Sequence, residues 1–142
     1  MTHRYFTVED AEAVLPKVRN HMTKLMNIHD ELTALSGVKV AADQFDWTAH
    51  VLAININKRY HELSFKYLAE LEALTRMGAY VKDVQQGLVD FCSKLGDKDI
   101  MLCWQYDEPT LLYYHDGQTG FEGRKPITEL KQTLIQQKNA LL

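Results

Sequence analysis

Polar and aromatic side chains gather between Lys82 and Arg124, and we expect the function of the chain to lie in this block. Carboxylates and an imidazole that converge on one point can hold a divalent cation. Spacing along strands does not by itself establish convergence, and carboxylates on the surface or at turns are the commoner explanation. A divalent metal is nevertheless the cofactor that this block suggests. Our metal-ligand candidates are Asp83, Asp90, Glu108 and His115.

The standard metal motifs are incomplete in this sequence. A zinc metalloprotease helix needs two histidines four residues apart, with a glutamate after the first. His61 and Glu62 satisfy the first half of that pattern, but Phe65 stands where the second histidine is required. A di-iron bundle needs glutamate followed three residues later by histidine, and no such pair occurs in the chain. A metal site would therefore have to be assembled from dispersed residues.

A glycine-rich segment from Gly117 to Pro126 could instead bind an anion or another small ligand. Glycines allow successive backbone N–H groups to turn toward one anion, and the two basic residues of the segment add positive charge. The segment does not match the phosphate-loop pattern. A structural loop whose arginine pairs with an acidic residue explains it equally well. Our ligand-binding candidates are Lys82, Tyr114, Arg124 and Lys125.

The two cysteines, Cys92 and Cys103, are predicted to be reduced thiols that pack in the core. They do not form a Cys-x-x-Cys motif, and free cysteine is among the most buried residue types. A nucleophilic thiol would need a base beside it, and His115 is the only histidine on a predicted strand that could serve.

Two long helices occupy the amino-terminal half. Thr7 followed by early carboxylates predicts the start of the first helix, and Gly37 predicts its end. Pro16 predicts a kink or a restart within it. The connection is expected from Val38 to Gln44, and the second helix from about Asp46 to Arg76.

The second helix is apolar on two sides, which is typical of a helix between two packing partners. One partner is the first helix, because a short connection makes the two helices antiparallel neighbours. The other partner is either the sheet or a second copy of the chain. Phe65 and Leu68 lie off the stripe that faces the first helix, and they are our interface candidates.

Beyond Gly78 the apolar period changes from helical to extended. If Asp97 and Lys98 form a two-residue hairpin loop, Cys92 lies opposite Cys103, Phe91 opposite Trp104 and Asp90 opposite Gln105. That register separates Asp90 from His115 along the sheet. The predicted strands are Tyr80–Val84, Leu88–Leu95, Ile100–Tyr106 and Leu111–His115, and a final helix is predicted from Thr128 to about Asn139.

Short motifs in a fixed order along nearly the whole chain carry a family resemblance. They are Phe6-Thr7-Val8-Glu9-Asp10-Ala11 with Leu15-Pro16 and Arg19, Val81-Lys82-Asp83, Gly87-Leu88-Val89-Asp90-Phe91, Leu102-Cys103-Trp104 with Glu108, Tyr114-His115, Gly120-Phe121 and Gly123-Arg124-Lys125-Pro126-Ile127. Together they resemble the uncharacterised bacterial family known as domain of unknown function 2203. The resemblance implies a single domain and no particular reaction. Cys92, Asp107 and Tyr114 depart from its usual proline, glycine and tryptophan, so a thiol role for Cys92 is not implied as a family property.

Length and composition predict one domain over residues 1–142. The net charge of −3 argues against a nucleic-acid binder, which usually carries a basic stripe. No apolar run approaches the ~20 residues of a membrane span, and the first residues lack the apolar core of a secretory signal, so we expect a cytoplasmic protein. The predicted fold is α+β. A long antiparallel helix hairpin (about 7–77) packs beside a small, mainly antiparallel meander sheet (about 80–116), followed by the glycine-rich loop and a C-terminal helix (117–142).

Three classes of function follow from this fold. The first, which we favour at this point, is a non-catalytic module that forms a homo-oligomer or binds a protein partner. The second is a protein that binds a small ligand, an anion or a divalent metal through the strand block. The third is an enzyme with Asp90, Glu108 and His115 as acid–base groups, although no nucleophile–base pair or cofactor motif is present. The sequence specifies neither a substrate nor catalytic residues.

Overall fold

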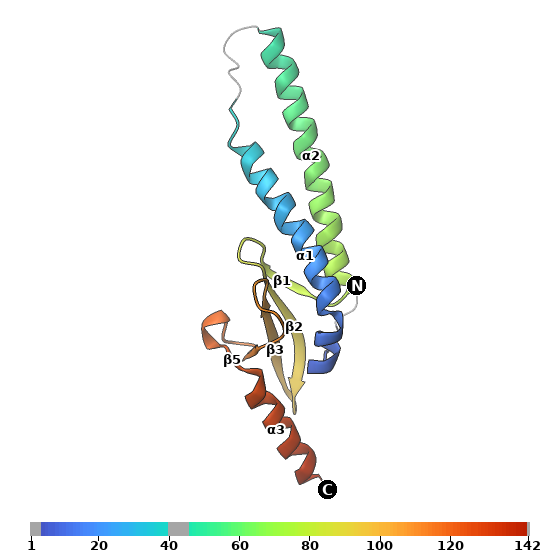
Figure 1. Cartoon of the computed structure of the whole chain (residues 1–142), viewed down its shortest axis with the longest axis vertical. Coiled ribbons are helices and arrows are strands. Elements are labelled where there is room, and N and C mark those ends of the chain that lie inside the picture. Colours follow the sequence, from blue (N-terminus) through green and yellow to red (C-terminus); the bar gives the residue numbers. More distant parts are fainter. Residues whose placement is uncertain (1–3, 40–45, 142) are drawn as a thin grey trace.

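The computed structural model describes residues 4–39 and 46–141 and confirms the α+β class. Its helix hairpin projects beyond the sheet at one end of an elongated molecule, and the C-terminal helix extends from the other end (Figure 1). No helix within the described ranges contains a stretch long and apolar enough to cross a membrane. The elements are α1 (Val8–Ser36), α2 (Trp47–Arg76), β1 (Tyr80–Asp83), β2 (Leu88–Leu95), β3 (Lys98–Gln105), β4 (Tyr113–Asp116), η1 (Phe121–Gly123), β5 (Lys125–Pro126) and α3 (Ile127–Ala140).

Helix α1 begins with a capping box at Thr7, as predicted. The Thr7 hydroxyl accepts a hydrogen bond from the Asp10 backbone N–H at 3.0 Å, and the Asp10 carboxylate accepts from the Thr7 N–H at 3.2 Å. The helix then continues through Pro16, so the restart that we considered there is wrong. Leu15 and Val18 are buried on either side of the proline, and their packing offsets the missing hydrogen bond.

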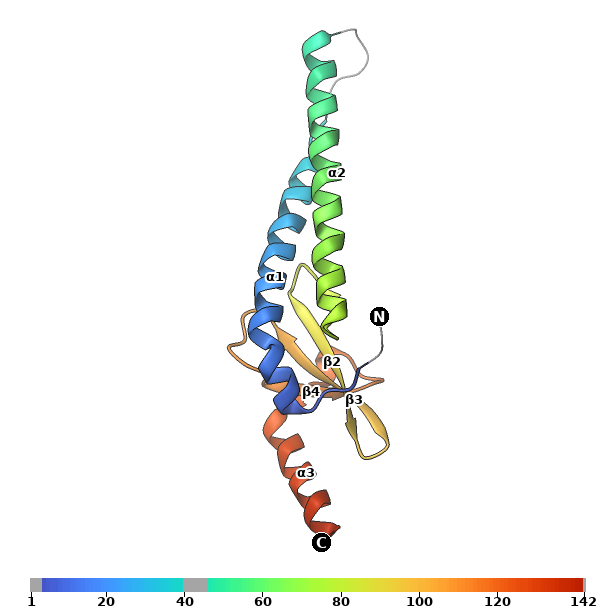
Figure 2. The same ribbon diagram turned by 90° about the vertical axis from the view of Figure 1, so that its right-hand side faces the viewer.

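The two long helices lie side by side and antiparallel (Figure 2). Asp46 caps α2 by accepting from the N–H groups of Thr48 and Ala49. A hydrogen bond between the His21 ring and the Glu70 carboxylate joins the two helices. The connection predicted from Val38 to Gln44 lies mostly outside the described residues.

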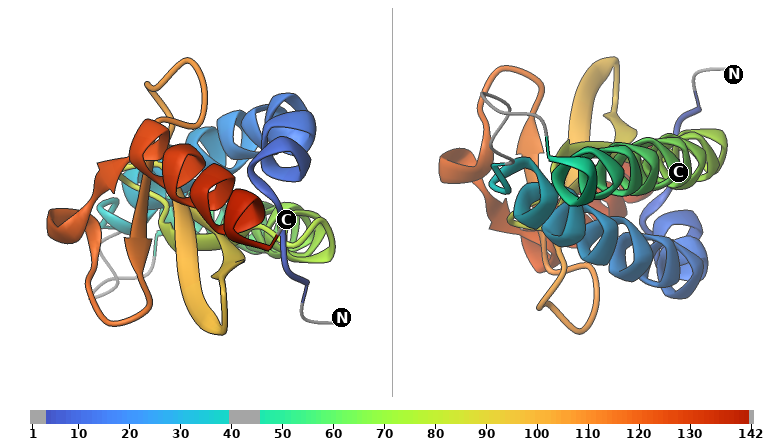
Figure 3. Two further views of the ribbon diagram at one scale, coloured as in Figure 1. Left: turned by 90° about the horizontal axis from the view of Figure 1, so that it is seen from below. Right: turned by 90° about the horizontal axis from the view of Figure 1, so that it is seen from above.

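The five strands form one antiparallel meander in the order β1-β2-β3-β4-β5. Because side chains alternate between the faces of a strand, one face of the sheet is apolar and packs against helices. Seen along the long axis, α1 and α3 cover parts of this inner face (Figure 3). The buried cluster between them includes Val18, Met22, Leu25, Val89, Phe91, Ile100, Leu102, Trp104, Ile127 and Leu130.

The predicted register of β2 against β3 is wrong by two positions. Asp90 lies opposite Cys103, Phe91 opposite Leu102 and Cys92 opposite Met101. The loop consists of Gly96 and Asp97 rather than Asp97 and Lys98. Gly96 has a φ of +63°, which suits the first loop position of a type II′ hairpin turn. Because the loop moved by one residue, the pairing moved by two, and every side chain kept its face of the sheet.

Other strand limits also differ from the prediction. Strand β3 begins two residues earlier, at Lys98, because the loop ends at Asp97 and Lys98 pairs with Leu95. Strand β4 begins two residues later, at Tyr113. The two-residue strand β5 was not predicted, since Lys125 and Pro126 carry no strand pattern of their own and pair only because β4 is beside them.

Gly87, in the turn between β1 and β2, provides a test of this register. It has a φ of +70°, and a Cβ atom there would lie 2.5 Å from the Cβ of Tyr106. We expect Gly87→Ala to lower the free energy of unfolding by about 2–4 kcal/mol, from backbone strain and overlap together. Gly96→Ala is the matched control. The φ of Gly96 is +63°, but a Cβ atom there would meet no atom within 4 Å apart from its chain neighbours, so backbone strain alone should cost about 1 kcal/mol. Urea denaturation measures both losses, and equal losses would contradict the packing of Tyr106 on Gly87.

Candidate functional site

Three potential ligand residues from three neighbouring strands meet on the outer face of the sheet, which is turned away from α1. Asp90 lies on β2, Cys103 on β3 and His115 on β4. The pairing of Asp90 with Cys103, and of Cys103 with Tyr113, places the first two side by side. His115 is two residues beyond Tyr113 and therefore points to the same face. All three are buried, with exposed fractions of 2%, 2% and 4%.

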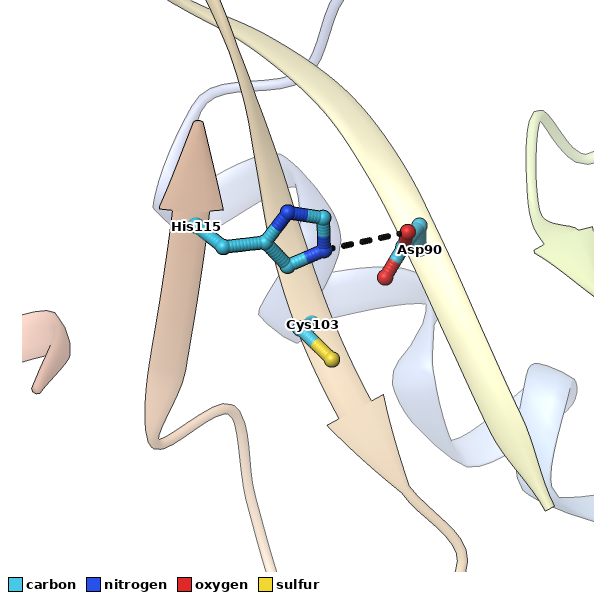
Figure 4. Close-up of side chains that lie close together, drawn as sticks. All are labelled: Asp90, Cys103 and His115. Atoms are coloured by element: carbon cyan, nitrogen blue, oxygen red, sulfur yellow. Dashed lines mark hydrogen bonds and ion pairs between the residues drawn. The ribbon is translucent and has the colours of Figure 1, made fainter. Parts of the chain in front are cut away.

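The side chains of Asp90 and His115 reach toward each other over the strand that carries Cys103 (Figure 4). His115 Nε2 is 3.2 Å from Asp90 Oδ2, and one potential ligand atom from each of the three residues lies within 4.8 Å of the others. The register that we predicted separated Asp90 from His115 along the sheet, and that expectation is wrong. The corrected register moves Asp90 next to Cys103, within reach of the imidazole.

Both ring nitrogens of His115 face oxygen atoms. Nδ1 is 2.8 Å from the backbone carbonyl oxygen of Asp116, and Nε2 faces the carboxylate of Asp90. A neutral imidazole has a single N–H, so one nitrogen would direct a lone pair at an oxygen. The contact at Nε2 is favourable only when a positive centre, either a proton or a metal ion, sits on that nitrogen.

With a proton on both nitrogens, His115 forms a buried ion pair with Asp90. The hydrogen bond to Asp90 is the largest cause that raises the pKa of His115 from 6.5 to about 10. Hydrogen bonds to Cys103 and to the Asp116 carbonyl act in the same direction, and burial acts against them. The exposed Lys82 brings a second cation, with its Nζ 3.8 Å from Asp90 Oδ2.

With a metal ion instead, the cluster supplies one carboxylate, one imidazole and one thiolate. This mixed donor set suits zinc, which binds Cys, His and Asp side chains. The Asp116 carbonyl would hold the ring by its Nδ1–H, as second-shell acceptors do for metal-bound histidines. Cys103 was not among our metal candidates. The sequence signal that could have placed Cys103 opposite Asp90 is Gly96, which suits the first loop position of a type II′ turn.

The cysteines are free thiols with different surroundings. Cys103 is buried, as expected, but it belongs to the polar cluster and not to the apolar core. Cys92 is only half-buried, so its predicted place in the core is wrong, and burial raises the pKa of its thiol. The two do not face each other across the hairpin, because Cys92 pairs with Met101.

The other two metal candidates have structural partners elsewhere. Asp83 accepts a hydrogen bond from the Gln86 backbone N–H and caps the turn after β1. The Glu108 carboxylate receives the guanidinium of Arg124 at 2.6 and 2.8 Å and the backbone N–H of Gln105 at 2.6 Å. Of the four residues, the structure therefore brings only Asp90 and His115 together.

Glu108 is the centre of a second network that joins three parts of the chain. Its backbone carbonyl accepts from Arg19 of α1 at 2.9 Å and from the indole N–H of Trp104 at 3.0 Å. Arg124 lies against the rings of Tyr113 and Phe121, with its guanidinium carbon 4.0 and 4.6 Å from their centroids. These contacts fix the segment between β4 and α3.

The four ligand-binding candidates do not lie together at one site. Arg124 is engaged by Glu108, which matches the structural explanation of the glycine-rich segment. Tyr114 is buried in the apolar core, where burial raises the pKa of its hydroxyl. Lys125 is exposed on β5, and Lys82 lies beside Asp90.

A helix hairpin on an antiparallel meander, with an Asp–Cys–His cluster on the outer face of the sheet, defines an α+β protein with a compact polar site. The model of the family described as uncharacterized conserved protein (DUF2203) matches residues 4–127, and the chain belongs to this family. No curated protein matches the chain, and neither does any solved structure.

The network around Glu108 leads to a prediction about stability. The side chains of Glu108 and Arg124 are 12% and 11% exposed, so Glu108→Ala leaves a buried guanidinium without its carboxylate. We expect a loss of about 3–5 kcal/mol in the free energy of unfolding. The exposed Glu122 is the matched control, and Glu122→Ala should change stability by less than about 0.5 kcal/mol. If urea denaturation gave losses of similar size for the Glu108→Ala and Glu122→Ala variants, Glu108 would not be a structural centre.

The Asp90–His115 ion pair leads to a prediction about pH. The folded chain holds one more proton than the unfolded chain between pH 6.5 and about 10, because the pKa of His115 is raised over that range. The stabilisation is therefore fully present below pH 6.5 and is lost as the pH rises through about 10. In EDTA-treated protein, the free energy of unfolding should fall more steeply with rising pH in the wild type than in His115→Gln. Parallel pH profiles of the two proteins would contradict a raised pKa for His115.

Proposed function

We propose that this chain is a divalent-metal-binding protein whose ligands are Asp90, Cys103 and His115. The observation that carries the proposal is the environment of His115, whose Nε2 faces a carboxylate while its Nδ1 faces a carbonyl. A cation at Nε2 resolves that contact, and the thiol of Cys103 supplies a third donor within 4.8 Å. The proposal belongs to the second class of function that the sequence left open.

The donor set favours zinc or a similar transition metal over magnesium or calcium. Calcium takes six to eight oxygen ligands, and magnesium keeps several waters in an octahedron of oxygens. This cluster offers a single carboxylate, together with nitrogen and sulfur, which are the donors of zinc sites. The two negative charges of the Asp90 carboxylate and a Cys103 thiolate would balance the two positive charges of a divalent ion.

Metal binding at this position would be linked to the stability of the sheet. The three residues come from β2, β3 and β4, so one ion would tie three neighbouring strands together. A ligand that binds only the folded chain raises the free energy of unfolding with the logarithm of its concentration once that concentration exceeds the dissociation constant. Three protein ligands also leave a tetrahedral ion one further position, which a water molecule would fill.

The acid–base enzyme that we considered from the sequence has less support. It required Asp90, Glu108 and His115 to act together, but Glu108 is held by Arg124 and does not join the cluster. Both nitrogens of the His115 ring are already engaged, and the side chain is almost fully buried.

Metal content is the direct test. We expect wild-type protein purified without chelator to contain about one zinc ion per chain by elemental analysis, because three donors converge on one position. His115→Ala and Cys103→Ser should lose it. Cys92→Ser is the matched control, since Cys92 lies two residues from Asp90 on the same strand and outside the cluster. After exchange with cobalt, sulfur-to-metal charge-transfer absorption should appear in the wild type and in Cys92→Ser but not in Cys103→Ser.

Two results would overturn the proposal. If EDTA-treated wild-type protein neither takes up zinc nor gains thermal stability when zinc is added, the positive centre at Nε2 is a proton and the cluster is a buried ion pair. If Cys103→Ser retains full zinc content and unchanged affinity, the thiol is not a ligand and the three-residue site is wrong.

A further inference from the structure

Helix α2 carries a row of large apolar side chains on the side away from α1, which we call the outer stripe. Its members are highly exposed, up to 75% for Phe65 and 66% for Trp47. At about 100° per residue, the outer stripe lies roughly 170° around the helix from the stripe that packs against α1. The outer stripe consists of Trp47, Val51, Ile54, Phe65 and Leu68.

The sheet does not cover this surface, although the sequence left that arrangement open. The inner face of the sheet packs on α1 and α3, and α2 contributes only Leu74 to the buried cluster, at the end nearest β1. A row of exposed large apolar side chains that spans some 30 Å of one helix exceeds the single, scattered apolar residues of an ordinary surface. A binding partner is therefore the natural occupant.

We infer that a second copy of this chain occupies the outer stripe, with the two α2 helices antiparallel. The apolar residues lie in two groups, one near the start of α2 and one beyond its middle, with a polar interval between them. A twofold axis near residue 60 places Val51 and Ile54 of each chain on the second group of the other. Ile54 then faces Phe65 of the partner subunit, and Val51 faces the partner's Leu68.

The charges of the polar interval favour the same arrangement. Lys58 and Glu62 are both exposed and lie on the same flank of the stripe, one turn apart. The antiparallel pairing puts Lys58 opposite Glu62 of the partner subunit, and symmetry makes this contact twice. A parallel pairing in register would instead place each lysine opposite the partner's Lys58, which is unfavourable.

Molar mass in solution tests the pairing. Light scattering should give about twice the chain mass of 16.4 kDa for the wild type. Phe65→Glu should give the mass of one chain, because it puts one charge from each chain into the apolar contacts with Ile54 of the partner subunit. Ile135→Glu is the matched control: Ile135 is an exposed apolar residue of α3, 59% accessible, and its replacement should leave the dimer intact. A single-chain mass for the wild type at high concentration would overturn the inference.

Charge reversal tests the orientation of the helices. We expect Lys58→Glu alone and Glu62→Lys alone each to weaken dimerisation at least about tenfold, because each creates two like-charge contacts. The double variant should restore the wild-type dissociation constant, since both contacts again join opposite charges. Circular dichroism checks that every variant is folded. A double variant as weak as the single variants would exclude antiparallel self-association.

The dimer inference and the metal-binding proposal can be tested independently of each other. The outer stripe lies on α2, whereas the Asp90–Cys103–His115 cluster lies on the sheet. Phe65→Glu should therefore become monomeric while retaining its zinc, and His115→Ala should lose zinc while remaining a dimer.

Discussion

The pairing of β2 with β3 is the constraint on which the rest of the structure depends. A two-residue loop beginning at Gly96 sets this register, and the register decides which side chains share a row on each face of the sheet. On the inner face it aligns Phe91 with Leu102 beneath α1, and on the outer face it puts Asp90 beside Cys103. The apolar core and the polar cluster are therefore two consequences of one backbone arrangement, because the faces of a strand alternate.

Polar side chains of the strand block form two physical networks. Asp90, Cys103 and His115 form a buried cluster whose charge must be balanced by a proton or a metal. Glu108 and Arg124 form a second network, which reaches α1 and holds the segment before α3. Buried charges of this kind persist in a fold only when they are paired, since desolvation of an unpaired charge costs several kcal/mol. The second network keeps β4 in place, and β4 carries His115.

The hairpin and the sheet contribute separately to the functions we propose. The sheet presents ligand atoms from three adjacent strands, a rigid arrangement that backbone hydrogen bonds maintain. Helix α2 extends beyond the sheet and exposes a second apolar stripe, headed by Trp47 and Phe65. In the dimer that we infer, long hairpins would join two sheets, each with its own polar cluster. The two proposals thus assign a binding role to the sheet and an assembly role to the hairpin.

The sequence alone determined the class of fold, the two long helices and the antiparallel meander, because apolar periodicity and capping residues such as Thr7 act locally. It also singled out Asp90 and His115. It did not reveal their contact, which depends on a register that a single loop residue can shift by two positions. The role of Cys103 and the pairing of Glu108 with Arg124 likewise depended on strands and loops distant in sequence, whose placement only tertiary packing decides.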